Sequence, residues 1–304
     1  MLLFWLSARP GWAGFAESVR AYQSGDYPTA VRALWPLAQQ GDARAQFLLG
    51  ALYAQGHGVP QDYGAAAQWF RRAAEQGHVA AQFNLGVRYH EGRGVPHDPG
   101  RAAAWYRRAA QQGFARAQYN LGVLYIHGDG VPRDARQAAQ WFRQAADQED
   151  PKAQYTLGLL YAEGVGVPHD DGEAYVWFTL AAARLSPGTD HQQAVHARDL
   201  VATRLTPAHL RAAQERARTW QPTPEMSAGD APAQPLARSA SPPAAASRVH
   251  QAQARLKAAG FDPGPPDGTP GPKTREALRQ YQRTKGLPAT GELDVPTLDA
   301  LHVR

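Results

Sequence analysis

The stretch ARAQFLLGALYAQGHGVPQDYGAAAQWFRRAAEQG, residues 43–77, decides the fold, because its pattern recurs three more times along the chain. The copies follow one another at intervals of 36 residues. The recurring positions include a glycine, a tyrosine and a tryptophan: Gly50, Gly86, Gly122 and Gly158; Tyr53, Tyr89, Tyr125 and Tyr161; Trp69, Trp105, Trp141 and Trp177. Agreement at this many positions over four copies indicates an internal repeat, and a repeat of this length is typical of stacked architectures.

Each copy has the pattern of a helical hairpin. In the first copy, Ala45, Leu49 and Leu52 have the spacing of one face of a helix. Two glycines and a proline at residues 56–60 end that helix. Asp62 then suits the N-cap of a second helix. Because a single hairpin cannot bury its own apolar face, the copies must stack, and the sequence predicts an all-α fold built as an α-solenoid of helical hairpins.

A glycine stands in the middle of the first helix of every copy, at Gly50 and its equivalents. A glycine in a helix interior costs about 1 kcal/mol relative to alanine. Its presence in all four copies predicts a packing reason, namely that a neighbouring helix approaches closely where the Cβ is missing.

The segments that flank the four copies differ from them, as capping units should. Residues Phe15–Gln40 are predicted to form a leading hairpin, with Gly25 in its turn. Asp190–Arg204 and Pro207–Trp220 are predicted to form two closing helices, the second of which starts with proline at its first position. The solenoid is therefore expected to span residues 15–220.

The recurring pattern resembles the Sel1-like repeat, a relative of the tetratricopeptide repeat. The resemblance rests on Ala45-Gln46-Phe47-Leu48-Leu49-Gly50-Ala51-Leu52-Tyr53, on Gly56-His57-Gly58-Val59, and on Asp62, Ala66, Trp69 and Ala73-Ala74. It covers about Phe15–Trp220 and implies a curved superhelix used for contact with a protein partner. Membership of such a family does not name that partner.

Positions at which the copies differ are candidates for a partner-binding surface. Two such positions are Leu48, Asn84, Asn120 and Thr156, and Leu52, Arg88, Leu124 and Leu160. Fixed positions are typical of a core and variable positions of a surface. We therefore predict a partner-facing surface that contains Asn84, Arg88 and Asn120, and the alternative is an ordinary solvated face.

A linker is predicted at residues 221–247, where apolar periodicity is lost and Pro, Ala and Ser dominate. Such a composition cannot bury enough surface to offset the entropy of ordering. The segment is expected to act as a semi-extended tether.

Helical patterns return in Arg248–Arg304, which predicts a small three-helix bundle behind the tether. The first helix ends at Gly260, and a loop rich in Pro, Gly and Asp follows it. Pro272 opens a second helix that closes at Gly286, and Asp294 suits the N-cap of a short third helix.

This segment resembles the peptidoglycan-binding-like domain found beside many cell-wall enzymes. The resemblance rests on Leu256–Phe261, on the loop Asp267-Gly268-Thr269-Pro270-Gly271-Pro272-Lys273-Thr274, on Tyr281-Gln282, on Gly286–Gly291, and on Asp294 with Thr297. It implies binding of peptidoglycan. The candidate ligand-binding residues are Asp267, Gly268, Gly271, Thr274, Arg279, Tyr281, Gln282 and Arg283. The alternative is that the loop has a structural role, since Asp and Gly also serve turns.

No constellation for catalysis is found in the sequence. There is no cysteine, which excludes thiol catalysis, disulfides and Cys-type zinc sites. There is no H-E-x-x-H pair and no G-x-S-x-G elbow. His97 and His169 lie two copies apart, so no shared metal site is expected. The sequence predicts a non-enzyme without metal or cofactor.

The net charge of +5 is small and spread along the chain, so a nucleic-acid partner is not expected. No apolar run reaches the length of a membrane span. Residues Met1–Gly14 have the apolar start and small residues of a signal peptide, without its basic beginning, and are interpreted as a truncated export signal. The alternative is a frayed hydrophobic N-terminus.

These observations favour an exported, non-catalytic scaffold in the periplasm or cell envelope. Its solenoid would bind a protein partner, and its C-terminal domain would bind peptidoglycan. Two alternatives stay open: an accessory regulator of a separate cell-wall hydrolase or synthase, and a cytoplasmic protein-interaction adaptor.

Overall fold

A computed structural model of the chain describes residues 10–222, 243–264, 271–287, 289–291, 293, 297 and 300–301. Every regular element in these ranges is a helix, which confirms the predicted all-α class. The chain divides into two compact units, Met1–Pro232 and Ala233–Arg304. Residues 1–9 of the predicted export signal and most of the predicted linker lie outside the described residues.

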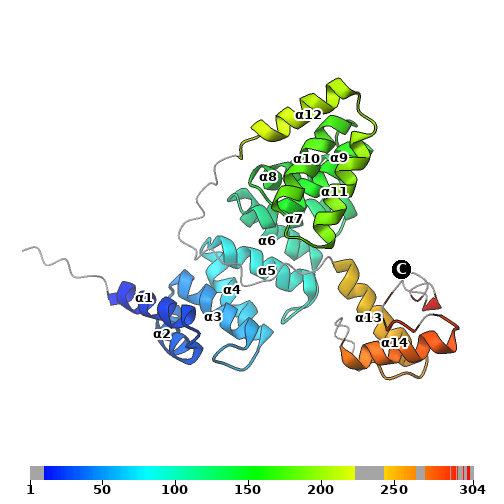
Figure 1. Ribbon diagram of the computed structural model, residues 1–304. Coiled ribbons are helices and arrows are strands. Elements are labelled where there is room, and N and C mark those ends of the chain that lie inside the picture. The colour runs from blue at the N-terminus through cyan, green and yellow to red at the C-terminus, as the bar shows by residue number, and fades with distance from the viewer. Residues whose placement is uncertain are drawn as a thin grey trace, which may run out of the picture. The chain divides into compact units, whose positions relative to one another are not determined.

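The helices of the first unit follow one another as hairpins, each lying beside the one before it (Figure 1). The leading hairpin consists of α1 (Pro10–Gln23) and α2 (Tyr27–Gln39). The four repeats consist of α3 (Ala43–Gln55) and α4 (Tyr63–Glu75), α5 (Val79–Glu91) and α6 (Pro99–Gln111), α7 (Ala115–His127) and α8 (Ala135–Asp147), and α9 (Pro151–Glu163) and α10 (Asp171–Arg184). The closing helices are α11 (Thr189–Ala202) and α12 (Pro207–Thr219). The predicted α-solenoid is therefore confirmed.

The second helix of each repeat begins at the aspartate that the sequence predicted. Asp62 Oδ1 accepts the backbone N–H of Ala65 at 2.9 Å, and Asp98 and Asp170 cap their helices in the same way. The first helix of each repeat ends in a left-handed glycine, such as Gly56 with a φ of 71°. Local capping chemistry thus sets the length of each hairpin.

The close approach predicted at the mid-helix glycines is confirmed. A Cβ at Gly86 would lie 2.7 Å from the ring of Tyr106, and a Cβ at Gly122 would lie 2.8 Å from the ring of Phe142. Both rings come from the second helix of the same hairpin and are buried. The missing side chain therefore makes room for an aromatic ring, which offsets the intrinsic cost of glycine in a helix.

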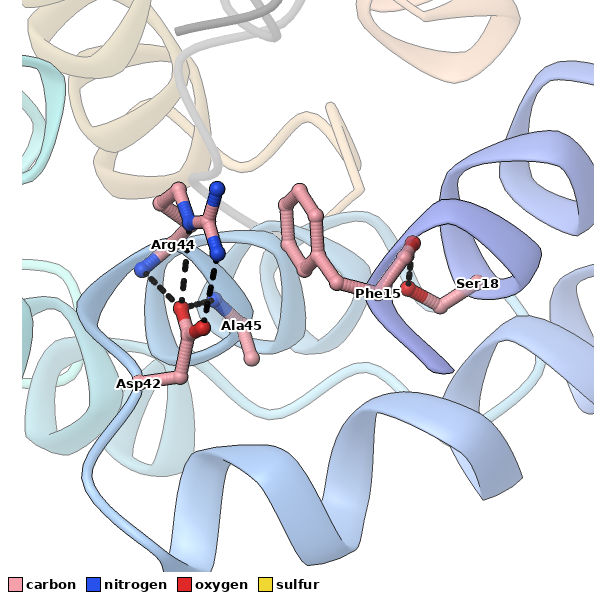
Figure 2. A network of polar contacts seen from close by, with 5 residues as sticks. All are labelled: Phe15, Ser18, Asp42, Arg44 and Ala45. Carbon is pink, nitrogen blue, oxygen red and sulfur yellow. Dashed lines mark hydrogen bonds and ion pairs between the residues drawn. The ribbon is translucent and has the colours of Figure 1, made fainter. Parts of the chain in front are cut away.

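The leading hairpin is held to the first repeat at the start of α3. Asp42 Oδ1 accepts the backbone N–H groups of Arg44 and Ala45 at 2.9 and 3.0 Å (Figure 2). Asp42 also forms an ion pair with the Arg44 guanidinium at 3.0 Å. That guanidinium lies 4.3 Å from the ring centre of Phe15 on α1, and Ser18 Oγ donates to the Phe15 carbonyl at 2.7 Å. The cation–π contact thus joins the two hairpins, and Asp42 holds the arginine that makes it.

The second unit contains α13 (Pro243–Ala258) and α14 (Pro272–Thr284). Its buried apolar core consists of Ala252, Leu256, Ala277, Leu278, Tyr281 and Leu301. Helix α13 begins at Pro243, inside the segment predicted as linker, because proline is tolerated in a first turn and the alanines that follow are strong helix formers. Asp294, the predicted cap of the third helix, lies outside the described residues.

Across the described residues, the helices are too short or too polar to cross a membrane.

Candidate binding surfaces

A row of hydrogen bonds joins each repeat to the next. In each of three repeats, an arginine of the second helix donates to the hydroxyl of a tyrosine in the following repeat. The pairs are Arg71–Tyr89, with 2.7 Å between guanidinium nitrogen and hydroxyl oxygen, Arg107–Tyr125 at 3.0 Å, and Arg143–Tyr161. We call these pairs the Arg–Tyr row. It presents one oriented guanidinium per repeat.

The arginines of the Arg–Tyr row have no carboxylate within ion-pair distance among the residues that the structure describes. Arg71 is exposed, and Arg107 and Arg143 are half-buried. Other arginines are neutralised, for example Arg44 by Asp42. The carboxylate of Asp147 lies one turn along α8 from Arg143; burial raises its pKa, and the positive charge of Arg143 opposes that rise. The row is therefore a stripe of positive charge with little internal compensation.

A groove of about 310 Å³ opens between α8 and α9, at the third pair of the row. Its polar lining consists of Arg136, Gln140, Arg143 and Tyr161. Its apolar lining includes Ala139, Leu157 and Val167. The Arg143 guanidinium is held by the Tyr161 hydroxyl and lies 4.9 Å from the ring centre of Trp177. The groove thus combines two cations and an amide with an apolar surface.

The third repeat differs from the other three at one residue of this groove. Arg136 occupies a position at which the other copies have glycine, at Gly64, Gly100 and Gly172. Its side chain is exposed. At this position a cation is therefore particular to the third repeat.

A second set of hydrogen bonds between the repeats, which we call the glutamine ladder, is structural. Gln46, Gln82, Gln118 and Gln154 are buried, and each donates to a backbone carbonyl of the preceding hairpin, as Gln82 does to Ala74. The first three also accept a hydrogen bond at 2.8 Å from the glutamines at positions 76, 112 and 148. The fourth is left without a partner for its buried Oε1. This ladder fixes the stacking of the repeats and offers nothing to a ligand.

The three residues predicted to form a partner surface make contacts inside the solenoid. Asn84 is half-buried and donates to the Ala80 carbonyl at 2.8 Å. Arg88 is buried and pairs with Glu91 at 3.3 Å; burial lowers the pKa of its guanidinium. Asn120 is half-buried and hydrogen-bonds Tyr106. A role in binding a partner stays a prediction for this set.

In the C-terminal domain, two of the predicted ligand residues lie in the interior. Thr274 is buried, accepts from Gln253 at 3.1 Å and donates to the Pro263 carbonyl at 2.8 Å. Gln282 is fully buried; it donates to the hydroxyls of Thr290 and Thr297 at 3.0 and 2.9 Å and accepts the N–H of Gly291 at 2.9 Å. Both side chains link α14 to the loops around it.

Tyr281 is also buried, and its hydroxyl donates to the Ala300 carbonyl at 2.7 Å. Gly271 lies at the N-cap of α14 with an extended backbone. Arg279 is partly exposed and pairs with Glu276 at 2.9 Å, and Arg283 is exposed. The structure therefore brings the two arginines, and not the aromatic ring or the amide, to the surface. Asp267 and Gly268 lie outside the described residues.

No group of three metal-ligating side chains is found in the described ranges. Two of the histidines make local contacts. His78 caps α5 by accepting the Ala81 N–H at 3.2 Å, and its ring stacks on Phe47 with 4.7 Å between centres. Burial lowers the pKa of His78 to about 4. His97 contacts the His90 carbonyl at 2.7 Å.

The Arg–Tyr row was not predicted from the sequence. Its signal was present, because arginine recurs at the same register in Arg71, Arg107 and Arg143 just as the tyrosines do. A search restricted to positions that vary between copies passes over a repeated polar residue. Repetition of a charged residue on a partly exposed face is as good a signal of a surface as variation is.

Family models match both parts of the chain. The model described as "Sel1 repeat" matches residues 43–78, 79–114, 115–150 and 151–184. The model described as "Putative peptidoglycan binding domain" matches residues 245–301. Both resemblances inferred from the residues are thereby confirmed.

Solved structures agree on the solenoid. A Sel1 repeat protein from Oxalobacter formigenes is 26% identical with a TM-score of 0.57, and the match covers 89% of this chain and 99% of that one. The protective antigen c5321 of uropathogenic Escherichia coli strains, which displays an SLR fold, is 26% identical with a TM-score of 0.57 over 96% of this chain and 63% of that one.

A curated relative is similar over a short stretch. It is the localization factor PodJL of Caulobacter vibrioides, 45% identical over 65 residues, which make up 21% of this chain. The match spans only 7% of the length of PodJL.

Proposed function

Since the chain is a Sel1 repeat protein that carries a peptidoglycan-binding-like domain at its C-terminus, we propose that it is a non-catalytic scaffold of the bacterial cell envelope. The solenoid binds a protein partner, and the C-terminal domain binds peptidoglycan. Linking the two modules raises the local concentration of the partner at the wall, without any contact between the modules being needed.

The observation that carries this proposal is the presence of both family matches in one chain. Four Sel1 repeats match residues 43–184, and the model described as a putative peptidoglycan binding domain matches residues 245–301. The repeats form one continuous stack, since each second helix contacts the first helix of the next repeat. A continuous stack offers an extended surface to a partner. The short similarity to a localization factor is in keeping with a protein that positions another one.

The non-catalytic part of the proposal is supported by the contents of the groove between α8 and α9. It is lined by arginines, an amide and a tyrosine hydroxyl, with no carboxylate, histidine or serine among its lining residues. A nucleophile with a base beside it, which acyl or glycosyl transfer needs, is not assembled there. We expect no lytic activity of the purified chain on peptidoglycan.

Sedimentation with purified peptidoglycan sacculi tests the wall-binding half. The full chain is compared with a chain that ends after Trp220, which keeps the complete set of repeats and closing helices. We expect the full chain to pellet with the sacculi and the shortened chain to stay in the supernatant. If equal fractions of the two chains pellet, the C-terminal domain is not a wall anchor, and a cytoplasmic adaptor is favoured.

A second experiment separates a scaffold from a regulator. Wall digestion by a purified lytic enzyme is followed with and without the full chain. Unchanged digestion is expected of a scaffold, whereas a change that depends on the solenoid would identify an accessory regulator of wall hydrolysis.

A further inference from the structure

We propose that the Arg–Tyr row and the groove between α8 and α9 form a docking site for an extended acidic segment of the partner protein. This inference rests on the proposed function in one respect, because it names the chemistry of the partner that the solenoid binds. It commits to a peptide with carboxylate side chains, and it places the strongest contact at the third repeat.

The guanidinium groups of the Arg–Tyr row are held in place before any ligand arrives. Arg71 and Arg107 each donate to a tyrosine hydroxyl at 2.7 and 3.0 Å. Arg143 does the same with Tyr161 and also lies 4.9 Å from the Trp177 ring centre. A guanidinium has five N–H donors, so one bond to a hydroxyl orients it and leaves the others for a carboxylate. Preorganised donors lose less entropy on binding.

The positive charge of the Arg–Tyr row is not compensated by nearby carboxylates in the part of the chain that the structure describes. Among the described residues no carboxylate lies within ion-pair distance of the row, while Arg184, Arg204 and Arg216 in the closing part of the solenoid all pair with Asp or Glu. Uncompensated arginines repeated on one face attract an anionic partner and steer its approach. Arginine also matches the planar carboxylate group better than lysine does.

At the third repeat, the site has the shape of a groove. Arg136 and Arg143 line the same groove of about 310 Å³, together with Gln140 and the apolar side chains of Leu157 and Val167. Two cations beside an apolar surface suit a peptide whose acidic residues alternate with small apolar ones, since side chains of an extended strand alternate between its faces. Gln140 is exposed and can bond the peptide backbone.

A binding measurement on the full chain tests the proposal. The probe is a fluorescein-labelled synthetic peptide in which glutamate alternates with alanine, and the reference probe has glutamine in place of every glutamate. Fluorescence anisotropy is expected to rise with the acidic peptide and not with the neutral one. The affinity should fall as salt is added, because exposed charges are screened.

Three single variants locate the site. Arg143→Gln is expected to weaken binding about tenfold, the lower end of the effect of a hydrogen bond to a charged group. Arg136→Gln is expected to weaken it about threefold to tenfold on the same grounds. Within the described residues only the backbone N–H of Arg136 is hydrogen-bonded, to Asp134, so the substitution of the side chain does not endanger the fold. Arg211→Gln removes an equal charge from exposed α12 and should leave binding unchanged.

The result that overturns the proposal is equal binding of the acidic and neutral peptides, or equal losses in Arg136→Gln and Arg211→Gln. Soluble wall fragments with free stem-peptide carboxylates are titrated in parallel; if they bind at the groove and the glutamate peptide does not, the groove belongs to a wall ligand and the proposal is wrong. Sacculus sedimentation by the full chain is a separate readout of the C-terminal domain. Failure of the wall anchor and failure of the acidic docking site can therefore be told apart.

Discussion

The solenoid and the C-terminal domain satisfy their buried polar groups in different ways. In the solenoid, one contact is made repeatedly, such as the buried glutamine of each first helix that donates to the hairpin before it. In the C-terminal domain, Gln282 alone ties α14 to Thr290, Gly291 and Thr297. The solenoid spreads its polar contacts over equivalent boundaries, whereas in the small domain three of the buried hydrogen bonds come from the single side chain of Gln282. The difference implies that loss of one glutamine contact should destabilise the solenoid little, whereas loss of the Gln282 side chain should open the C-terminal domain.

The two units can be observed separately. All eight tryptophans lie at or before Trp220. Tryptophan fluorescence therefore reports unfolding of the solenoid, and amide hydrogen exchange in α14 reports opening of the C-terminal domain.

The largest effect is expected where a repeat loop meets the backbone of the preceding repeat. Gly130 has a φ of 69°, and a Cβ there would lie 2.2 Å from the carbonyl carbon of Pro99. Gly130→Ala combines left-handed strain with overpacking against backbone, and we expect a loss of about 3 kcal/mol or more. Urea unfolding followed by tryptophan fluorescence measures it.

Gly77→Ala is the matched control for this variant. Gly77 has a φ of 88°, and a Cβ there meets no atom within 4 Å. We expect only the conformational cost, about 1 kcal/mol. Equal losses in the two variants would show that contact between repeat loops adds nothing to the stability of the stack.

Acid should weaken the solenoid before it weakens the C-terminal domain. Burial lowers the pKa of His78 to about 4, with Asp42 opposing the shift and Arg44 adding to it. Because the folded pKa lies below the unfolded value of about 6.5, the unfolded chain binds the proton more readily. The stability contributed by neutral His78 is complete above pH 6.5, is lost as the pH falls toward 4, and amounts to at most about 3 kcal/mol.

The buried polar side chains of the C-terminal domain in the described residues, Gln253, Thr274, Gln282 and Thr297, do not titrate. The protection of the α14 amides, corrected for the pH dependence of the intrinsic exchange rate, should thus change little between pH 7 and 5, while the urea midpoint of tryptophan fluorescence falls. His78→Asn keeps a capping side chain and should flatten that pH dependence. An unchanged slope in this variant would assign the acid sensitivity to another group.

Loss of the central amide is expected to open the C-terminal domain alone. Gln282→Leu removes the acceptor of the Gly291 N–H and two bonds to threonine hydroxyls, which should cost about 2 kcal/mol. Exchange in α14 should accelerate while the fluorescence transition stays in place. Gln280→Leu, on the exposed face of the same helix, is the control and should change neither.

The repeat period and its capping residues were sufficient to predict the solenoid. Gly50, Asp62 and their equivalents act within one hairpin or its direct neighbour, so sequence spacing alone identifies them. The Arg–Tyr row joins residues 18 positions apart on different hairpins. Its geometry depends on how the repeats stack, which spacing within one helix does not determine.

In the C-terminal domain, helical periodicity places two of the candidate ligand residues in the interior. Tyr281 and Gln282 were candidate ligand-binding residues because of the resemblance to the peptidoglycan-binding-like domain. Tyr281 lies four residues after Ala277, and Gln282 lies four residues after Leu278. This spacing places both on the apolar face of α14, and the structure buries them. The arginines at 275, 279 and 283 occupy the other face. The type of each residue suggested which side chains could bind a ligand, whereas the helical period determines which of those side chains lie at the surface.

The smallest predicted effect concerns the boundary between the third and fourth repeats, where the residue found at the earlier boundaries is replaced. Glu149 has a φ of 66°, at a position where the earlier boundaries have Gly41, Gly77 and Gly113. Its carboxylate pairs with Arg184, which stands where a glutamine would complete the buried ladder. Glu149→Gly should relieve about 1 kcal/mol of backbone strain and lose about 0.5 kcal/mol of exposed ion pair, a net gain of about 0.5 kcal/mol.

Adding Arg184→Gln to Glu149→Gly tests whether the repeated contact is what stabilises the stack. The new glutamine can donate to Gln154 Oε1, which is buried without a partner. The double variant should then gain about 1 kcal/mol over the single one, measured by the urea midpoint of tryptophan fluorescence. Glu149→Ala, which loses the ion pair and keeps the strain, should be slightly less stable than the natural chain. If the double variant gains nothing, the ladder orders the repeats without stabilising them, and the even sharing of stability along the solenoid has to come from its aromatic and alanine packing.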